Sequence, residues 1–335
     1  DKIIFCDLTF VPVLEAVEDQ LGSVKAMIIM TDKGSMPETE LSNFHCYEEL
    51  MEVETEEFDW PELDENQASS LCYSSGTTGN PKGVLYSHRS TILHSFAGRS
   101  ADGLAISGRD TVLPVVPMFH VNAWGIPYAC AMAGAKLVFP GGAMDGGSVA
   151  ELLIDEKVTI TAGVPSVWLM LLQHLKETGK TLPDLRRNIV GGSALPQSMI
   201  ETFENEYDVS CIHAWGMTEM SPLGTTGVLK KDSLSLPKEE QYKLQEKQGR
   251  GIYGVEMKIV DDDGLELSRD GVAFGNLMVR GPWIANGYFK GEGGDVLDAD
   301  GWLLGIATGR SKRGLETVLD HYKNHILLYR SFFYK

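Results

Sequence analysis

Residues 158–213 read VTITAGVPSVWLMLLQHLKETGKTLPDLRRNIVGGSALPQSMIETFENEYDVSCIH, and this stretch predicts the fold. Short β-rich apolar runs alternate in it with segments of helical spacing. A proline opens each helical segment, PSVWLMLLQHLKET at 165–178 and PQSMIETFENEY at 196–207. Proline is favoured in a first helical turn because its missing N–H group needs no partner there. The alternation therefore predicts an α/β fold with a mostly parallel sheet flanked by helices.

The same alternation extends outward over residues 67–230, and the pattern changes after them. The expected strands are Thr111–Val116, Ala135–Phe139, Val158–Thr161, Asn188–Gly191 and Val209–His213. Residues 231–248 are polar and predict a linker or an exposed helix. Beyond them, Gly254–Asp261 and Asn276–Arg280 predict further strands, with the turn signal DDDG between them. We expect an α/β region at 1–230, a linker and β-rich partial barrel at 231–302, and a divergent tail at 303–335.

Composition excludes several classes of protein. The 335 residues include 47 acidic and 29 basic side chains, which gives a formal net charge of −18. A sequence-independent nucleic-acid binder needs a basic face, so no nucleic-acid partner is expected. Five scattered cysteines without a Cys-x-x-Cys spacing indicate neither a disulfide framework nor a zinc site. The longest apolar region, Gly125–Phe139, is too short for a membrane span. We therefore expect a soluble, cytoplasmic protein.

The charge is distributed unevenly along the chain. Residues 48–65 hold ten carboxylates and no Lys or Arg, which is typical of a solvated surface segment. Residues 310–335 carry a net charge of +4 and end in ILLYRSFFYK, which has no clear strand or helix period. This tail differs in composition from everything before it.

The sharpest motif is YSSGTTGNPKG at 73–83, which places four hydroxyls, three glycines and one lysine in a short loop. Glycines let backbone N–H groups approach a phosphate, hydroxyls add donors and a lysine adds a positive charge. A polar surface loop is the alternative interpretation. The P-loop pattern of nucleotide triphosphatases does not fit, because proline stands before the lysine and no hydroxyl follows it. The loop predicts a local anion site within an acidic protein.

YSSGTTGNPKGV followed by SHR resembles the phosphate-binding signature of the adenylate-forming superfamily, which comprises acyl-CoA synthetases, luciferases and peptide-synthetase adenylation domains. The resemblance implies that the loop holds the β- and γ-phosphates of ATP. The implied contacts are Ser74, Ser75, Gly76, Thr77, Thr78, Gly79 and Lys82.

Two later segments resemble further parts of the same superfamily. GGSALP at 191–196 follows an expected strand and is similar to the stretch that contacts the adenine and the acyl group, which implies roles for Gly192, Ser193 and Ala194. HAWGMTE at 213–219 resembles the aromatic-Gly-x-Thr-Glu signature. It implies that Trp215 and Gly216 flank the adenine, that Met217 also binds the nucleotide, and that Thr218 contacts the α-phosphate. Glu219, with Thr77, is implied to bind Mg²⁺. Lys82, Thr218 and Glu219 are the implied catalytic residues.

PMFHVNAWG at 117–125 resembles the fatty-acyl-CoA synthetases in particular. It implies that His120 borders the acyl channel and that Trp124 closes it, although such residues often only pack in a core. By contrast, His88, His94 and His174 are interpreted as structural. His321 and His325 have a metal-like spacing but no neighbouring glutamate, so no metal role is expected for them.

The resemblance implies an AMP-forming acid–thiol ligase with ATP, Mg²⁺ and coenzyme A as cofactors and co-substrates. A fatty carboxylate would attack the α-phosphorus of ATP, and coenzyme A would then take the acyl group from the acyl-adenylate. The small-molecule partners are the acid, ATP and coenzyme A, and the resemblance permits a homodimer. A peptide-synthetase adenylation domain or a luciferase-like oxygenase is disfavoured by PMFHVNAW. GRGIYG at 249–254 satisfies G-x-G-x-x-G but does not follow a strand, so a dinucleotide site is not expected.

The sequence also departs from the superfamily pattern. Its start lies downstream of where members begin, and Asn276 stands where glutamate is usual. Thr308 and Gly309 are followed by Arg310, where the family has the aspartate that holds the ATP ribose. Nothing beyond Trp302 resembles the mobile C-terminal domain, which is therefore expected to be absent. A frameshift or truncation would explain the tail. The alternative function is a catalytically deficient fragment that binds only nucleotide or acyl-adenylate.

Overall fold

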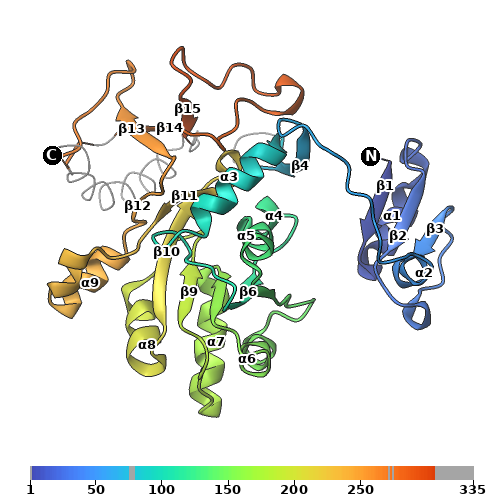
Figure 1. Cartoon of the computed structure of the whole chain (residues 1–335), viewed down its shortest axis with the longest axis horizontal. Helices are drawn as coiled ribbons and strands as arrows, with labels where there is room; N and C mark the ends of the chain where they lie inside the picture. Colours follow the sequence, from blue (N-terminus) through green and yellow to red (C-terminus); the bar gives the residue numbers. More distant parts are fainter. Residues whose placement is uncertain (1, 75–79, 271, 274, 306–335) are drawn as a thin grey trace. The chain divides into compact units, whose positions relative to one another are not determined.

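The computed structural model describes residues 2–74, 80–270, 272–273 and 275–305 (Figure 1). The chain divides into two compact units, Asp1–Leu63 and Asp64–Lys335. The boundaries expected at residues 230 and 302 were based on changes in sequence pattern and not on compactness, and they stay predictions. Arg310, His321, His325 and the rest of the divergent tail after residue 305 lie outside the described residues.

The first unit is a small α/β arrangement with one parallel sheet. Its parallel strands are β1 (Ile3–Cys6), β2 (Ala26–Ile29) and β3 (Phe44–Cys46), in that order across the sheet. The helical segments are η1 (Leu8–Phe10), α1 (Val11–Val17), η2 (Glu18–Gln20), η3 (Lys33–Ser35) and α2 (Tyr47–Glu52). Val11 on α1 and Ile29 on β2 belong to its apolar core. Residues 51–65 are all exposed, as expected for the acidic segment.

The second unit begins with an antiparallel hairpin that carries the glycine-rich loop. The two strands are β4 (Ala68–Tyr73) and β5 (Gly83–Ser87), and β5 leads directly into α3 (His88–Gly98). Ser87 caps this helix, because its hydroxyl accepts from the backbone N–H of Ser90 while the Ser90 hydroxyl interacts with the backbone of Ser87. The hairpin and the helix hold both ends of the loop.

A seven-stranded sheet forms the body of the second unit, in the order β12-β11-β10-β9-β8-β6-β7 (Figure 1). Its parallel strands are β6 (Thr111–Val115), β7 (Lys136–Leu137), β8 (Ile160–Gly163), β9 (Arg187–Val190) and β10 (Ser210–Gly216). The two antiparallel strands at one edge are β11 (Leu223–Thr226) and β12 (Arg250–Gly251). All five predicted strands are present. β10 runs three residues further than predicted because Ala214–Gly216 pair with β11.

Helices cover both faces of this sheet. They are α4 (Val121–Trp124), α5 (Ile126–Ala133), α6 (Gly146–Asp155), α7 (Pro165–Thr178), α8 (Gln197–Tyr207) and α9 (Lys238–Gln245), with short turns η4 (Thr218–Met220) and η5 (Lys231–Ser235). The predicted helix at 165–178 coincides with α7, whereas Pro196 is the N-cap of α8 rather than its first residue. Trp168 on α7 and Phe203 on α8 are fully buried and stack edge to face on one side of the sheet.

The segment after residue 231 differs from the prediction in one respect. It does form a helix, α9, but Gln241, Tyr242 and Gln245 on that helix are buried. The Tyr242 hydroxyl donates to Asn205, so α9 packs on α8 instead of standing free in solvent. The mostly polar sequence concealed this buried side because its buried residues are hydrogen-bonded polar groups rather than apolar ones.

The β-rich part is a three-stranded antiparallel sheet, with β13 (Glu256–Val260), β14 (Asn276–Arg280) and β15 (Leu303–Gly305), and a short turn η6 (Phe289–Gly291). The predicted strand at 276–280 coincides with β14. Within the described residues, no helix has both the length and the apolar character needed to cross a membrane.

Candidate functional site

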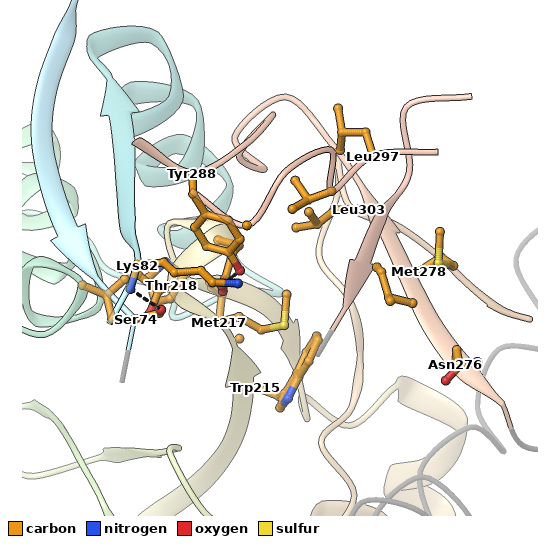
Figure 2. Close-up of a pocket in the computed structure, with 18 of the residues that line it drawn as sticks. Ser74, Lys82, Trp215, Met217, Thr218, Asn276, Met278, Tyr288, Leu297 and Leu303 are labelled. Carbon is orange, nitrogen blue, oxygen red and sulfur yellow. Dashed lines mark hydrogen bonds between the residues drawn. The ribbon is translucent and has the colours of Figure 1, made fainter. Parts of the chain in front are cut away.

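A cavity of about 910 Å³ lies in the second unit, where the parallel strands β9 and β10 end (Figure 2). Its wall includes Ser74 and Lys82 from the β4–β5 hairpin, Gly191 and Gly192 after β9, Trp215–Glu219 at the end of β10, and side chains of the β13–β15 sheet. Open α/β sheets bind ligands at the carboxyl ends of their strands. The position of this cavity is therefore that of a ligand site.

Ser74 and Lys82 hold the two ends of the glycine-rich loop together. The Ser74 backbone N–H donates to the Lys82 carbonyl at 2.9 Å, and the Lys82 N–H donates to the Ser74 hydroxyl at 3.3 Å. The Lys82 ammonium lies over the ring of Tyr288, 4.9 Å from its centroid. Ser75, Gly76, Thr77, Thr78 and Gly79 lie outside the described residues, so their predicted phosphate and metal contacts stay predictions.

Thr218 and Glu219 lie in the turn that follows β10, and two tyrosines hold this turn. The Tyr86 hydroxyl donates to the Thr218 carbonyl at 2.5 Å, and the Tyr288 hydroxyl donates to Oε1 of Glu219 at 2.6 Å. Burial, together with the hydrogen bond to Glu219 and its negative charge, raises the pKa of Tyr288. Tyr86, which is almost fully buried, also has a raised pKa because of burial. Both hydroxyls are therefore donors at neutral pH.

Trp215 and Met217 lie between the hairpin and the β13–β15 sheet (Figure 2), and Gly216 between them in sequence also lines the cavity. The pairing of β10 with β11 changes register between Trp215 and Gly216. At this point the backbone of Gly216 lies so close to the Pro222 carbonyl that a Cβ atom would be 1.9 Å from the oxygen. Only glycine fits there, so the packing of the backbone alone accounts for a glycine at position 216, and no ligand is needed to explain it.

The loop after β9 contributes less of its length to the cavity than the sequence predicts. Gly191 and Gly192 line the cavity, and Gly192 has a left-handed φ of +76°. A side chain at Gly191 would meet the ring of Trp124 at 3.2 Å. Ser193 and Ala194 are exposed and are not among the lining residues, so their predicted contacts are not brought together in this structure.

His120 and Trp124 both line the cavity, from a turn with unusual backbone geometry. Four consecutive residues, 121–124, have positive φ values between 49° and 59°. A non-glycine residue held there costs of order 1–3 kcal/mol. The Asn122 amide helps to hold the turn by donating to the Ser70 hydroxyl of β4 at 2.9 Å. Burial lowers the pKa of His120, which favours the neutral imidazole.

His94 has the structural role that the sequence predicts, but it also contacts the wall of the cavity. Its Nε2 atom accepts a hydrogen bond from the backbone N–H of Leu223 at 3.1 Å, and Leu223 lines the cavity. The imidazole is 3% exposed and lies edge to face with Trp283. Burial lowers the pKa of His94 to about 4, so the ring is neutral and Nε2 stays an acceptor.

We expect His94 to make the fold acid-sensitive below pH 6.5. In the unfolded chain its pKa is near 6.5, so between pH 6.5 and 4 the unfolded state binds a proton that the folded state excludes. The free energy of unfolding should fall with pH over this window by about 3 kcal/mol on account of His94. Replacing His94 with Gln keeps an acceptor for Leu223 but removes the titration. Urea unfolding at pH 7, 6, 5 and 4 should therefore show a smaller loss in His94→Gln than in the parent.

The exposed His45 provides the matched control for this experiment. His45→Gln should lose stability with acid in parallel with the parent chain. Equal pH dependence of the parent and His94→Gln would contradict the buried, neutral state of His94.

The residues at the cavity fit a magnesium ion that is bound by one protein carboxylate together with the phosphates of a substrate. Glu219 uses Oε1 for Tyr288, which leaves Oε2 for a cation. Among the described residues, no cluster of three or more His, Cys, Asp or Glu could hold a metal by itself. Mg²⁺ is commonly bound through one or two carboxylates plus substrate phosphates, so one carboxylate is sufficient at such a site.

Neither Tyr288 nor Tyr86 was predicted from the sequence to have a role. No local pattern around either residue signals a site, because each tyrosine meets its partner across more than 60 residues of sequence. Asn276 lines the cavity and donates to the carboxylate of Asp262 at 3.3 Å, so the residue that departs from the expected glutamate lies at the cavity rim.

Comparisons with known proteins agree with this geometry. The sequence model of a family described as AMP-binding enzyme matches residues 2–289. A 3-methylmercaptopropionyl-CoA ligase of Ruegeria lacuscaerulensis and a medium-chain-fatty-acid–CoA ligase of Ectopseudomonas oleovorans are each 48% identical, over 97% of this chain and 60% of the relative. This chain thus spans 60% of the length of these two relatives.

A crystal structure of an anthranilate CoA ligase in complex with anthranoyl-AMP has a similar fold. It superposes with a TM-score of 0.76 at 20% sequence identity, and the match covers 90% of this chain and 55% of that one. At this identity the likeness concerns the fold alone, and it confirms the predicted α/β class.

Proposed function

Because the chain belongs to the family of AMP-binding enzymes, we propose that it is an AMP-forming acyl-CoA synthetase. It activates a fatty or related carboxylic acid with ATP and transfers the acyl group to coenzyme A. The observation that carries this proposal is the cavity, whose wall includes Lys82, Thr218 and Glu219. These residues come from two distant segments of sequence and supply a cation, a hydroxyl and a carboxylate at one place.

The proposed reaction needs no covalent bond to the protein. An oxygen of the carboxylate forms a bond to the α-phosphorus of ATP, and the bond from that phosphorus to pyrophosphate breaks. Lys82 compensates phosphate charge, and Thr218 contacts the α-phosphate. A magnesium ion on Glu219 would neutralise further negative charge as pyrophosphate leaves. Catalysis then depends on alignment and on preorganised charge.

The acid is proposed to enter the side of the cavity that His120 and Trp124 border. Its neighbours there are the buried, apolar side chains of Leu104, Ile189 and Leu223. Burial keeps the His120 imidazole neutral. An apolar wall of this kind favours an uncharged acyl chain. The relatives that act on medium-chain fatty acids and on 3-methylmercaptopropionate support an acid of this class.

Acid-dependent exchange of pyrophosphate into ATP tests the proposal. The chain is incubated with MgATP, labelled pyrophosphate and a panel of acids that includes 3-methylmercaptopropionate and C4 to C16 fatty acids. We expect exchange above background with at least one acid, and acyl-CoA when coenzyme A is added. Nucleotide binding without any exchange would favour the alternative, a catalytically deficient fragment that binds nucleotide or acyl-adenylate only. The absence of both exchange and nucleotide binding would refute the synthetase proposal and the alternative of a nucleotide-binding fragment.

The proposal also includes the cellular compartment and the oligomeric state of the protein. All five cysteines are free in the structure, which supports a reducing compartment such as the cytoplasm. A homodimer belongs to the same proposal, and analytical ultracentrifugation of the chain would test it.

A further inference from the structure

Tyr288 contacts two of the oppositely charged side chains that line the cavity, Glu219 and Lys82. Its hydroxyl donates to Oε1 of Glu219 at 2.6 Å, and its ring faces the Lys82 ammonium at 4.9 Å (Figure 2). No ion pair joins Lys82 directly to Glu219, although both belong to the described part of the chain and line the same cavity. One side chain thus contacts both charged groups.

The backbone around Tyr288 is tied to the turn that carries Glu219. The Ala285 N–H donates to the Glu219 carbonyl at 2.8 Å, and the Ser221 hydroxyl donates to the Trp283 carbonyl at 2.8 Å. The indole N–H of Trp283 reaches the Leu223 carbonyl at 3.4 Å. These bonds join residues 283–285 to residues 219–223, so Tyr288 extends from a segment whose position relative to Glu219 is well determined.

The Lys82 ammonium also lies close to Gly293. A Cβ atom built on Gly293 would lie 2.8 Å from Nζ of Lys82, and the φ of Gly293 is +83°. The ammonium is therefore close both to the Tyr288 ring and to a residue without a side chain. Its position depends on the ring, because a cation is attracted to the face of an aromatic ring.

Resting on the proposed function, we propose that Tyr288 is a positioning residue that keeps Lys82 and Glu219 available to nucleotide and metal. Its ring prevents the ammonium and the carboxylate from neutralising each other. Its hydroxyl occupies one oxygen of Glu219 and fixes the orientation of the other toward the cavity. A hydrogen bond to a charged acceptor is strong enough to hold a carboxylate in this way.

The two parts of the side chain make different contributions, and two variants separate them. Tyr288→Phe removes the hydroxyl and keeps the ring as a spacer. It should reduce the contribution of Mg²⁺ to the affinity for ATP, because the carboxylate of Glu219 is then free to rotate. Tyr288→Leu also removes the aromatic face, so that Lys82 can pair with Glu219. It should weaken nucleotide binding both with and without metal.

Calorimetric titration of the chain with ATP, once in Mg²⁺ and once in EDTA, tests this role without relying on turnover. We expect Tyr288→Phe to raise the Kd of MgATP about tenfold and to change the Kd of metal-free ATP less than about twofold. In a Glu219→Gln background the Tyr288→Phe substitution should have no further effect on MgATP, because the two residues act through one bond. Tyr253→Phe, at a tyrosine that is 96% exposed, is the matched control and should bind as the parent does.

The outcomes separate this role from the proposed function. A parent chain that binds neither MgATP nor ATP would refute the proposed nucleotide site itself. Parent-like binding of MgATP by Tyr288→Phe would leave the nucleotide site intact and overturn the positioning role. An equal loss for MgATP and metal-free ATP in Tyr288→Phe, or effects that add independently to those of Glu219→Gln, would also overturn it.

Discussion

Replacing Gly216 with alanine should lower the free energy of unfolding by about 3 kcal/mol or more. The reason is steric, because the new Cβ atom would lie 1.9 Å from the carbonyl oxygen of Pro222, far inside van der Waals contact. The obstacle is the backbone of Pro222, the residue directly before β11, and backbone cannot turn aside as a side chain can. Urea unfolding followed by tryptophan fluorescence measures the loss, and MgATP binding should weaken in the variant that remains folded because Trp215 and Met217 would move.

Gly98 provides the matched control for this substitution. It is a buried glycine in the last turn of α3, and a Cβ atom there would meet its nearest neighbour, a methyl group of Leu223, at 3.9 Å. Gly98→Ala should be neutral or slightly stabilising, because alanine is favoured over glycine in a helix. An unfolding midpoint for Gly216→Ala equal to that of the parent would show that β10 and β11 can separate at no cost, contrary to the packing described here.

The largest effect on the proposed function is expected from Lys82→Ala. Loss of one preorganised charge at the phosphates should reduce kcat/KM for pyrophosphate exchange by about 100- to 1,000-fold, by analogy with the removal of one oxyanion donor. Binding of the carboxylic acid should change little, because His120 and Trp124 border a different part of the cavity. Exchange kinetics with varied ATP and varied acid, together with calorimetric binding of ATP, measure these effects.

Lys243→Ala is the control for this substitution. Lys243 lies on α9, where it pairs with Glu239 four residues earlier, and it does not line the cavity. The kcat/KM values of Lys243→Ala for exchange, measured with varied ATP and with varied acid, should match those of the parent. Exchange by Lys82→Ala at the parent rate would mean that the lysine has no role in adenylation.

Local sequence patterns were enough to predict the main body of the fold. The helix at 165–178 and the strand at 276–280 coincide with α7 and β14. The helix has a proline at its first position, and the strand is a short apolar run that follows a turn signal. The segment that forms helix α9 was predicted only as a linker or an exposed helix. Its buried side is polar, and polar residues become buried only when partners such as Asn205 are supplied by another helix.

The candidate site was predicted less evenly. Lys82, Trp215 and Glu219 lie in motifs specific enough to be recognised, and all three line the cavity. Ser193 and Ala194 belong to an equally recognisable motif, yet they are exposed and do not line the cavity. Sequence neighbours share a motif, but the turn of the backbone after Gly192 decides which of them reach the cavity.

The sequence by itself determined the α/β class, the position of the strands and the segments that end at the site. These properties follow from periodicity, proline and glycine placement and long motifs, all of which are local. Only the tertiary structure decided that Tyr288 would contact both Lys82 and Glu219, that Tyr86 would hold the Thr218 carbonyl, and that Gly216 would leave no room for a side chain. Each of these depends on atoms brought together from separate strands or segments, and no pattern within one segment encodes the distance to another.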